Sequence, residues 1–120
     1  NFIEPISFWN VENAENMGVM FRRCTKFNAD ISLWKTPRNK KMDEMFLECE
    51  AFNSNLNFWD VSNVNNMENV FGRAFKFNKP IGDWNVSSVT LMRAMFSGAL
   101  SFNQDISKLI MSQSWPGAAS

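Results

Sequence analysis

The strongest constraint in this chain is a repeat of 25 residues that runs through it without insertion or deletion. Tryptophan recurs at this interval, at Trp9, Trp34, Trp59 and Trp84. Two phenylalanine series and one methionine series keep the same interval: Phe2, Phe27, Phe52, Phe77 and Phe102; Phe21, Phe46, Phe71 and Phe96; Met17, Met42, Met67 and Met92. A fixed period of about 20–50 residues is the signature of stacked repeats. We therefore expect the 120 residues to form nearly five stacked coils.

Each repeat unit contains a strand-like half and a helix-like half. Ile81, Trp84 and Val86 have the spacing of the short strand in leucine-rich repeats, with the last two on one face. Val64 begins an apolar series with steps of three and four residues that continues to Phe71, which is typical of a short helix opening near Ser62. The predicted fold class is an α/β solenoid of the leucine-rich-repeat type, with short parallel strands on one face and short helices on the other.

The predicted solenoid covers residues 1–111, and residues 112–120 are expected to be an irregular tail or cap. Leu109 and Met111 continue the tryptophan and valine columns, which predicts a fifth strand, whereas Trp115 and Pro116 stand where a helix should follow. Solenoids need polar capping turns, and neither end of the chain has one. We therefore expect a segment of a longer solenoid, or a subunit held in an assembly, with Trp115 capping the core or contacting a partner.

Two columns are expected to support the coils from within. The tryptophan column should be buried, so that the Trp59→Ala change costs about 3–5 kcal/mol. An asparagine column follows the core phenylalanines and consists of Asn28, Asn53, Asn78 and Asn103. Such a column predicts an asparagine ladder, in which each side chain bonds the backbone of the next coil. The alternative is a set of solvated loop asparagines.

Composition excludes several classes of function. Lysine and arginine number 12 against 12 aspartate and glutamate, and a neutral chain lacks the charge to hold nucleic acid. With no histidine, Ser-His-Asp and Cys-His catalysis and most zinc sites are excluded. The apolar runs are too short for a membrane-spanning helix. Cys24 and Cys49 share a column with Ala74 and Ala99, which favours buried thiols, although a disulfide between adjacent coils stays open.

The acidic residues do not indicate an active site. Asp43, Glu44, Glu48 and Glu50 crowd together after a basic run, and surface charge compensation explains their spacing. A calcium site at Asp30 or Asp105 has no supporting loop motif. We therefore predict a protein that is not an enzyme and holds no cofactor or metal.

The candidate partner-binding residues lie next to the tryptophan column. Phe8, Leu33 and Phe58 occupy one position of successive units and Asp83 follows them, which predicts an exposed apolar stripe. The alternative is that a loop covers this stripe. Phe75 and Leu100 form a second, smaller candidate.

Several segments resemble a known family of repeat proteins. The run from Phe102 to Ser107, the run from Trp59 to Met67 and the run from Met95 to Ala99 are similar to the repeat of BspA-like leucine-rich-repeat surface proteins, which reads close to M-F-x-x-A-x-x-F-N-x-D-I-S-x-W-D-V-S-N-V-T-N-M. The resemblance implies a right-handed solenoid used for binding or adhesion, a cell-surface or secreted location, and no catalytic residues. Lys79 and Pro80 depart from the pattern, as does the run from Lys35 to Arg38.

The expected function is non-enzymatic protein binding or structural scaffolding, by a surface protein or by a subunit of an assembly. The partners would be proteins, with no nucleic acid and no membrane span. The alternative is a carbohydrate or host-surface adhesin that uses the exposed aromatic side chains.

Overall fold

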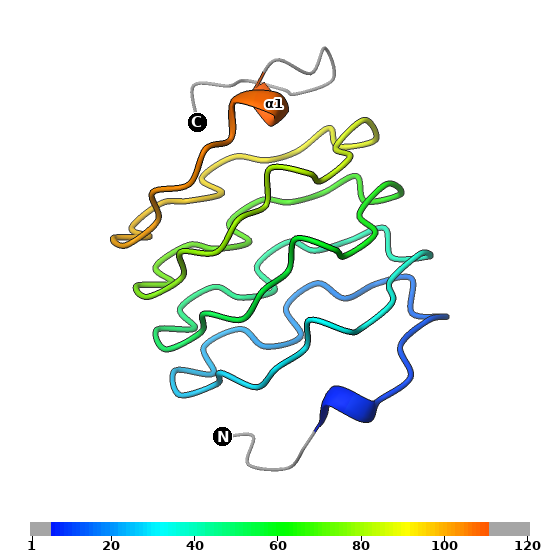
Figure 1. Cartoon of the computed structure of the whole chain (residues 1–120), viewed down its shortest axis with the longest axis horizontal. Coiled ribbons are helices and arrows are strands. Elements are labelled where there is room, and N and C mark those ends of the chain that lie inside the picture. The colour runs from blue at the N-terminus through cyan, green and yellow to red at the C-terminus, as the bar shows by residue number, and fades with distance from the viewer. Residues whose placement is uncertain (1–5, 111–120) are drawn as a thin grey trace.

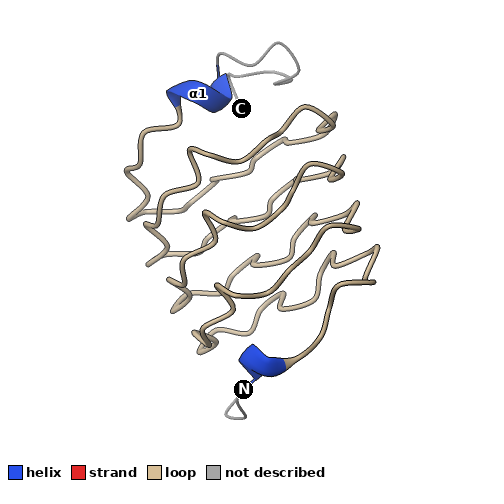
Figure 2. Cartoon of the chain, turned by 45° about the vertical axis from the view of Figure 1, so that its right-hand side comes forward, coloured by secondary structure: helices blue, strands red, loops and turns tan. Residues whose placement is uncertain are grey.

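The computed structural model describes residues 6–110, in which the chain makes successive turns that lie one upon another (Figure 1). A 3-10 helix, η1 (Ile6–Phe8), lies at one end of the stack. A four-residue α-helix, α1 (Ser107–Ile110), lies at the other end, and the backbone between them consists of turns and irregular segments (Figure 2). None of the helices within residues 6–110 is long and apolar enough to cross a membrane.

The predicted α/β solenoid is wrong, because residues 6–110 contain no strand and no sheet. Parallel pairing is limited to three isolated bridges, Asn16 with Lys41, Lys41 with Asn66, and Asn66 with Leu91. The expected strand from Ile81 to Val86 is interrupted, because the Trp84 N–H donates to the Ile81 carbonyl over 3.1 Å and closes a tight turn. An extended strand cannot make a hydrogen bond between residues three apart.

The expected helices are also absent from the described part of the chain. Asn69 and Arg73 have φ angles of 55° and 54°, in the left-handed region that a right-handed helix cannot contain. The equivalent positions of the other turns share this feature, at Val19, Arg23, Glu44, Glu48, Ala94 and Gly98. The apolar spacing of three and four residues comes instead from consecutive turns, such as the one closed by the Val70 N–H on the Met67 carbonyl.

Backbone hydrogen bonds between turns replace those of a sheet or helix. Met67, Asn69, Phe71 and Arg73 donate their N–H groups to carbonyls of the following turn, those of Leu91, Arg93, Met95 and Ser97, over 2.7–3.0 Å. The same alternating series joins residues 17–23 to residues 41–47 and residues 42–48 to residues 66–72. We call this series the inter-turn ladder. It satisfies backbone groups that an irregular chain would otherwise bury without partners.

The core is a set of stacked aromatic columns. Ring centroids are 5.9 Å apart between Phe46 and Phe71 and 6.1 Å apart between Trp34 and Trp59. Each buried indole also reaches the preceding turn: the Nε1–H of Trp34 donates to the Ile6 carbonyl, that of Trp59 to the Ile31 carbonyl and that of Trp84 to the Leu56 carbonyl. Trp9 departs from the expected buried column, because it is 50% exposed.

The last described turn also differs from its prediction. Instead of a fifth strand, the chain forms α1, in which Leu109 is buried. Met111 and the expected tail or cap at residues 112–120 lie outside the described residues.

Candidate functional site

Three large apolar side chains stand out from successive turns at the same position. Phe8 is 89% exposed, Leu33 is 84% exposed and Phe58 is 82% exposed. Leu33 and Phe58 lie at the corners of tight turns that are closed by the following tryptophan, whose N–H donates to Ile31 or to Leu56. A corner residue points away from the core, so the tight turns direct these side chains to the surface. We call Phe8, Leu33 and Phe58 the apolar row.

The apolar row ends in a charged pair. Asp83 occupies the next turn, where its Oδ1 lies 3.3 Å from the Lys108 Nζ and its Oδ2 accepts a hydrogen bond from the Asn57 Nδ2 over 3.1 Å. The Asn57 hydrogen bond, followed by the contact with Lys108, lowers the pKa of Asp83. The surface therefore changes from apolar to ionic between the third and fourth members of this column.

A shallow pocket of about 230 Å³ lies beside the apolar row, between the first two turns. Its lining includes the apolar-row residues Phe8 and Leu33, the tryptophans Trp9 and Trp34, and Lys35. The half-exposed ring of Trp9 stacks at 6.4 Å on the buried ring of Trp34. Asn10 and Glu12 also line the pocket, so polar groups border the apolar row at this end.

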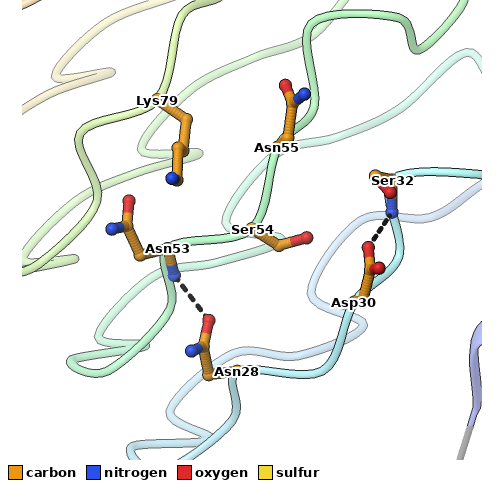
Figure 3. A pocket seen from close by; sticks show the side chains of 7 residues that line it. All are labelled: Asn28, Asp30, Ser32, Asn53, Ser54, Asn55 and Lys79. Atoms are coloured by element: carbon orange, nitrogen blue, oxygen red, sulfur yellow. Dashed lines mark hydrogen bonds between the residues drawn. The ribbon is translucent and has the colours of Figure 1, made fainter.

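A larger pocket, of about 330 Å³ and lined by polar side chains, lies over the second to fourth turns (Figure 3). We call it the polar pocket. Its lining is Asn28, Asp30, Ser32, Asn53, Ser54, Asn55 and Lys79. Hydrogen bonds from the Ser32 hydroxyl and the Ser32 N–H lower the pKa of Asp30. The sequence reasoning did not identify this pocket, although the recurrence of aspartate and asparagine at positions 30, 55 and 105 was a usable signal.

The asparagine column lies along one edge of this polar pocket. Asn53 donates its N–H to the Asn28 Oδ1 over 2.8 Å, and Asn78 donates to the Asn53 Oδ1 over 2.9 Å (Figure 3). Asn103 donates in the same way to the Asn78 Oδ1 over 2.9 Å. The side-chain carbonyls of Asn28, Asn53 and Asn78 therefore accept backbone N–H groups of the next turn, and the column stabilises the stacking of the turns.

The second candidate pair lies apart from the apolar row. Phe75 is half-buried, with the Arg73 guanidinium carbon 5.1 Å from its ring centroid. Leu100 is 80% exposed on the next turn. Trp115, the remaining residue predicted to contact a partner, lies outside the described residues.

The two cysteines are free thiols in this structure. Cys49 is buried, and its Sγ donates to the Phe21 carbonyl over 2.9 Å. Burial, and to a smaller extent the neighbouring Cys24, raise the pKa of the Cys49 thiol to about 12. A thiol with this pKa is protonated at neutral pH and is a weak nucleophile.

The charged residues pair across turns at the surface. Arg22 Nη1 lies 2.8 Å from Glu44 Oε1, and Arg23 Nε lies 3.6 Å from Glu48 Oε1. Within residues 6–110 no group of three or more carboxylates or thiols is placed to hold a metal ion. The Asp105 carboxylate accepts the Ser107 N–H, which lowers the pKa of Asp105. The arrangement of these groups is that of a charged surface.

One buried polar residue was not singled out by the sequence reasoning. Asn39 is 1% exposed, and its Oδ1 accepts hydrogen bonds from the N–H groups of Met17 and Lys41. Its Nδ2 is buried with no partner in the part of the chain that the structure describes. The equivalent residues are Ala14, Val64 and Val89, so an amide among apolar residues in this column was the available signal.

A family model described as "Mycoplasma protein of unknown function, DUF285" matches residues 1–71. No curated protein and no solved structure matches the chain.

Proposed function

The chain belongs to the DUF285 family of Mycoplasma proteins of unknown function, and we propose that it is a non-enzymatic protein-binding module whose contact surface is the apolar row. It would act as a binding or scaffold unit of a surface protein or of an assembly. The resemblance to BspA-like repeat proteins supports this proposal, because it implies binding or adhesion without catalysis.

The observation that carries the proposal is the contiguity of the exposed apolar side chains. Single exposed apolar residues are ordinary on protein surfaces and need no explanation. Phe8, Leu33 and Phe58, however, follow one another on adjacent turns, and each is more than four-fifths exposed. A contiguous apolar patch with a polar border is typical of a protein interface. The Asp83–Lys108 pair supplies such a border at one end.

The placement of the titratable groups also favours binding over catalysis. The carboxylates described above form surface ion pairs or accept hydrogen bonds from residues two positions further along the chain. Acid–base chemistry needs groups of opposed pKa that face one substrate position. Asp30, Asp83 and Asp105 all have lowered pKa values, so each of them is an ionised carboxylate at neutral pH.

Site-specific photocrosslinking tests the proposal. A benzophenone amino acid replaces Phe58 in one sample and Leu100 in a matched control, because both side chains are about equally exposed. After irradiation in a cell lysate, we expect protein adducts from position 58 that are absent from position 100. Equal labelling at the two positions, or no protein adduct at position 58, would contradict a protein-binding row.

Carbohydrate binding is the second candidate, and the polar pocket favours it. The pocket is lined by asparagine, aspartate, serine and lysine side chains, which can form hydrogen bonds with sugar hydroxyls. The same turns carry Leu33 and Phe58. A glycan array probed with the chain and with the Asp30→Ala/Asn55→Ala variant separates the two functions. Glycan binding that this variant loses, without protein adducts at position 58, would replace protein binding as the function.

A further inference from the structure

We infer that the protein partner of the apolar row is a second copy of this chain, and that the two copies meet about a two-fold axis that passes by Leu33. This inference rests on the proposed function of the row as a protein contact. It adds the identity of the partner, the arrangement of the two rows and the residue that lies on the axis.

The exposed area of the row is sufficient for a small dimer interface. A phenylalanine side chain buries about 150–250 Å² in a contact. With exposures of 89%, 84% and 82%, Phe8, Leu33 and Phe58 offer on the order of 500 Å² per copy. Two copies together reach roughly 1,000 Å², which is the lower limit for a specific protein interface. Exposed aromatic surface at Trp9 and the neighbouring pocket adds to this area.

The spacing of the row selects a partner with the same period. Its members lie one turn apart, and stacked side chains of successive turns in the core are separated by about 6 Å, as the 6.1 Å between the Trp34 and Trp59 rings shows. A partner must present side chains or gaps at this spacing to contact all three members. A second copy does so by construction, because the same 25-residue repeat sets its spacing.

The order of residues in the row suits a two-fold contact. The row reads Phe8, Leu33, Phe58, which is the same type of residue in either direction. A two-fold axis at Leu33 places the Phe8 of one copy against the Phe58 of the other, and Leu33 against Leu33.

The charged end of the row selects the antiparallel arrangement. If the two rows ran parallel, Asp83 of one copy would face Asp83 of the other, and like charges at an interface are repulsive. In the antiparallel arrangement Asp83 of one copy does not face Asp83 of the other. It keeps its hydrogen bond from Asn57 and its ion pair with Lys108.

Sedimentation velocity over a concentration series tests the dimer, with Phe58→Ser as the disrupting variant and Leu100→Ser as the control. Both changes remove an exposed apolar side chain, so both variants should keep the native tryptophan fluorescence. We expect a monomer–dimer equilibrium for the parent chain, a dimer dissociation constant raised about tenfold or more by Phe58→Ser, and none of this change with Leu100→Ser. A parent chain that stays monomeric, or a dimer equally stable in both variants, would overturn the inference.

Disulfide trapping tests the two-fold arrangement. Leu33→Cys faces itself across the axis and should give a covalent dimer under mild oxidation, whereas Phe58→Cys alone should not. The parent chain measures any crosslinking through Cys24 and Cys49. Equal trapping at positions 33 and 58 would contradict the antiparallel contact. If the chain is monomeric but position 58 still crosslinks to another protein, the proposed function stands and the second copy as partner is wrong.

Discussion

The first and third turns of the molecule share a tryptophan and a valine in the same register, yet these residues are buried to very different extents. Trp59 in the third turn is 3% exposed, whereas Trp9 in the first described turn is 50% exposed. Val61 is buried, but its equivalent Val11 is only partly buried. The residue type is the same in both turns, so it does not account for the difference. The first described turn still buries Ile6, Met17 and Phe21, so the lower burial is local to Trp9 and Val11.

Hydrogen bonds join the third turn to both of its neighbours. The Trp59 indole donates to the Ile31 carbonyl of the preceding turn over 2.9 Å. In the inter-turn ladder, the Asn66 carbonyl of the third turn accepts the Met42 N–H of the preceding turn. The Met67 N–H of the third turn donates to the Leu91 carbonyl of the following turn. Each turn is therefore completed by its neighbours, as in other repeat proteins.

The largest effect should come from removing the same side chain in the interior and at the end. Trp59→Ala creates a large cavity and leaves the Ile31 carbonyl without its indole partner, so we expect a loss of about 3–5 kcal/mol in the free energy of unfolding. Trp9→Ala removes a half-exposed ring and should cost only about 1 kcal/mol. Urea denaturation of both variants measures the difference, and equal losses would show that the two turns do not differ.

A smaller effect should come from the asparagine column. Asn53→Ala removes the oxygen that accepts the Asn78 N–H, which should lower the free energy of unfolding by about 1 kcal/mol. The matched control is Asn55→Ala, since the Asn55 Oδ1 accepts the local Asn57 N–H in its own turn. Thermal denaturation of the two variants compares a bond between turns with a bond within one. The interpretation of the column as a support fails if the control is destabilised as much as Asn53→Ala.

An effect of the opposite sign is expected at Asn39. Asn39→Val replaces an amide whose buried Nδ2 lacks a partner in the described part of the chain by the residue found at Val64 and Val89. Met17 keeps its second acceptor, the Lys41 carbonyl at 3.1 Å. We expect the free energy of unfolding to rise by about 1 kcal/mol in chemical denaturation. A loss of stability would mean that the Asn39 oxygen matters more than its unpaired nitrogen.

The smallest effect should come from the ion pairs that join turns at the surface. Arg22→Ala breaks the 2.8 Å contact with Glu44, and because both side chains are partly exposed the loss should be below about 0.5 kcal/mol. Denaturation in low and high salt checks this, since screening should remove most of the difference. A large effect that persists in high salt would indicate that charge pairing rivals aromatic stacking between turns.

The period of the stack and most of its core positions were readable from the sequence, because identical residues at a fixed interval must meet in successive turns. The local conformation was not readable. Apolar steps of three and four residues at Val64, Met67, Val70 and Phe71 suit a helix and equally suit consecutive tight turns. The left-handed φ angles at Asn69 and Arg73 show that the tight turns are correct. Neither residue is a glycine, so the sequence does not indicate a left-handed conformation at these positions.

The candidate site was partly readable for the same reason. The apolar row follows from its place next to the tryptophan column, and its exposure follows from the tight turns that the structure adds. The polar pocket depends on how side chains from three turns converge, from Asn28 to Lys79. A pattern along the sequence does not specify how side chains of different turns converge.

Amide hydrogen exchange followed by NMR tests the central claim most directly, namely that hydrogen bonds between turns replace those of helices and strands. The account predicts slow exchange at residues 42, 44, 46 and 48 and again at residues 67, 69, 71 and 73, because these N–H groups donate to the following turn. The intervening residues 45, 47, 70 and 72 donate within their own turn and should also be protected. It also predicts Cα chemical shifts of left-handed residues at Asn69 and Arg73. Helical Cα shifts across residues 62–71, or fast exchange at residues 67, 69, 71 and 73, would contradict it.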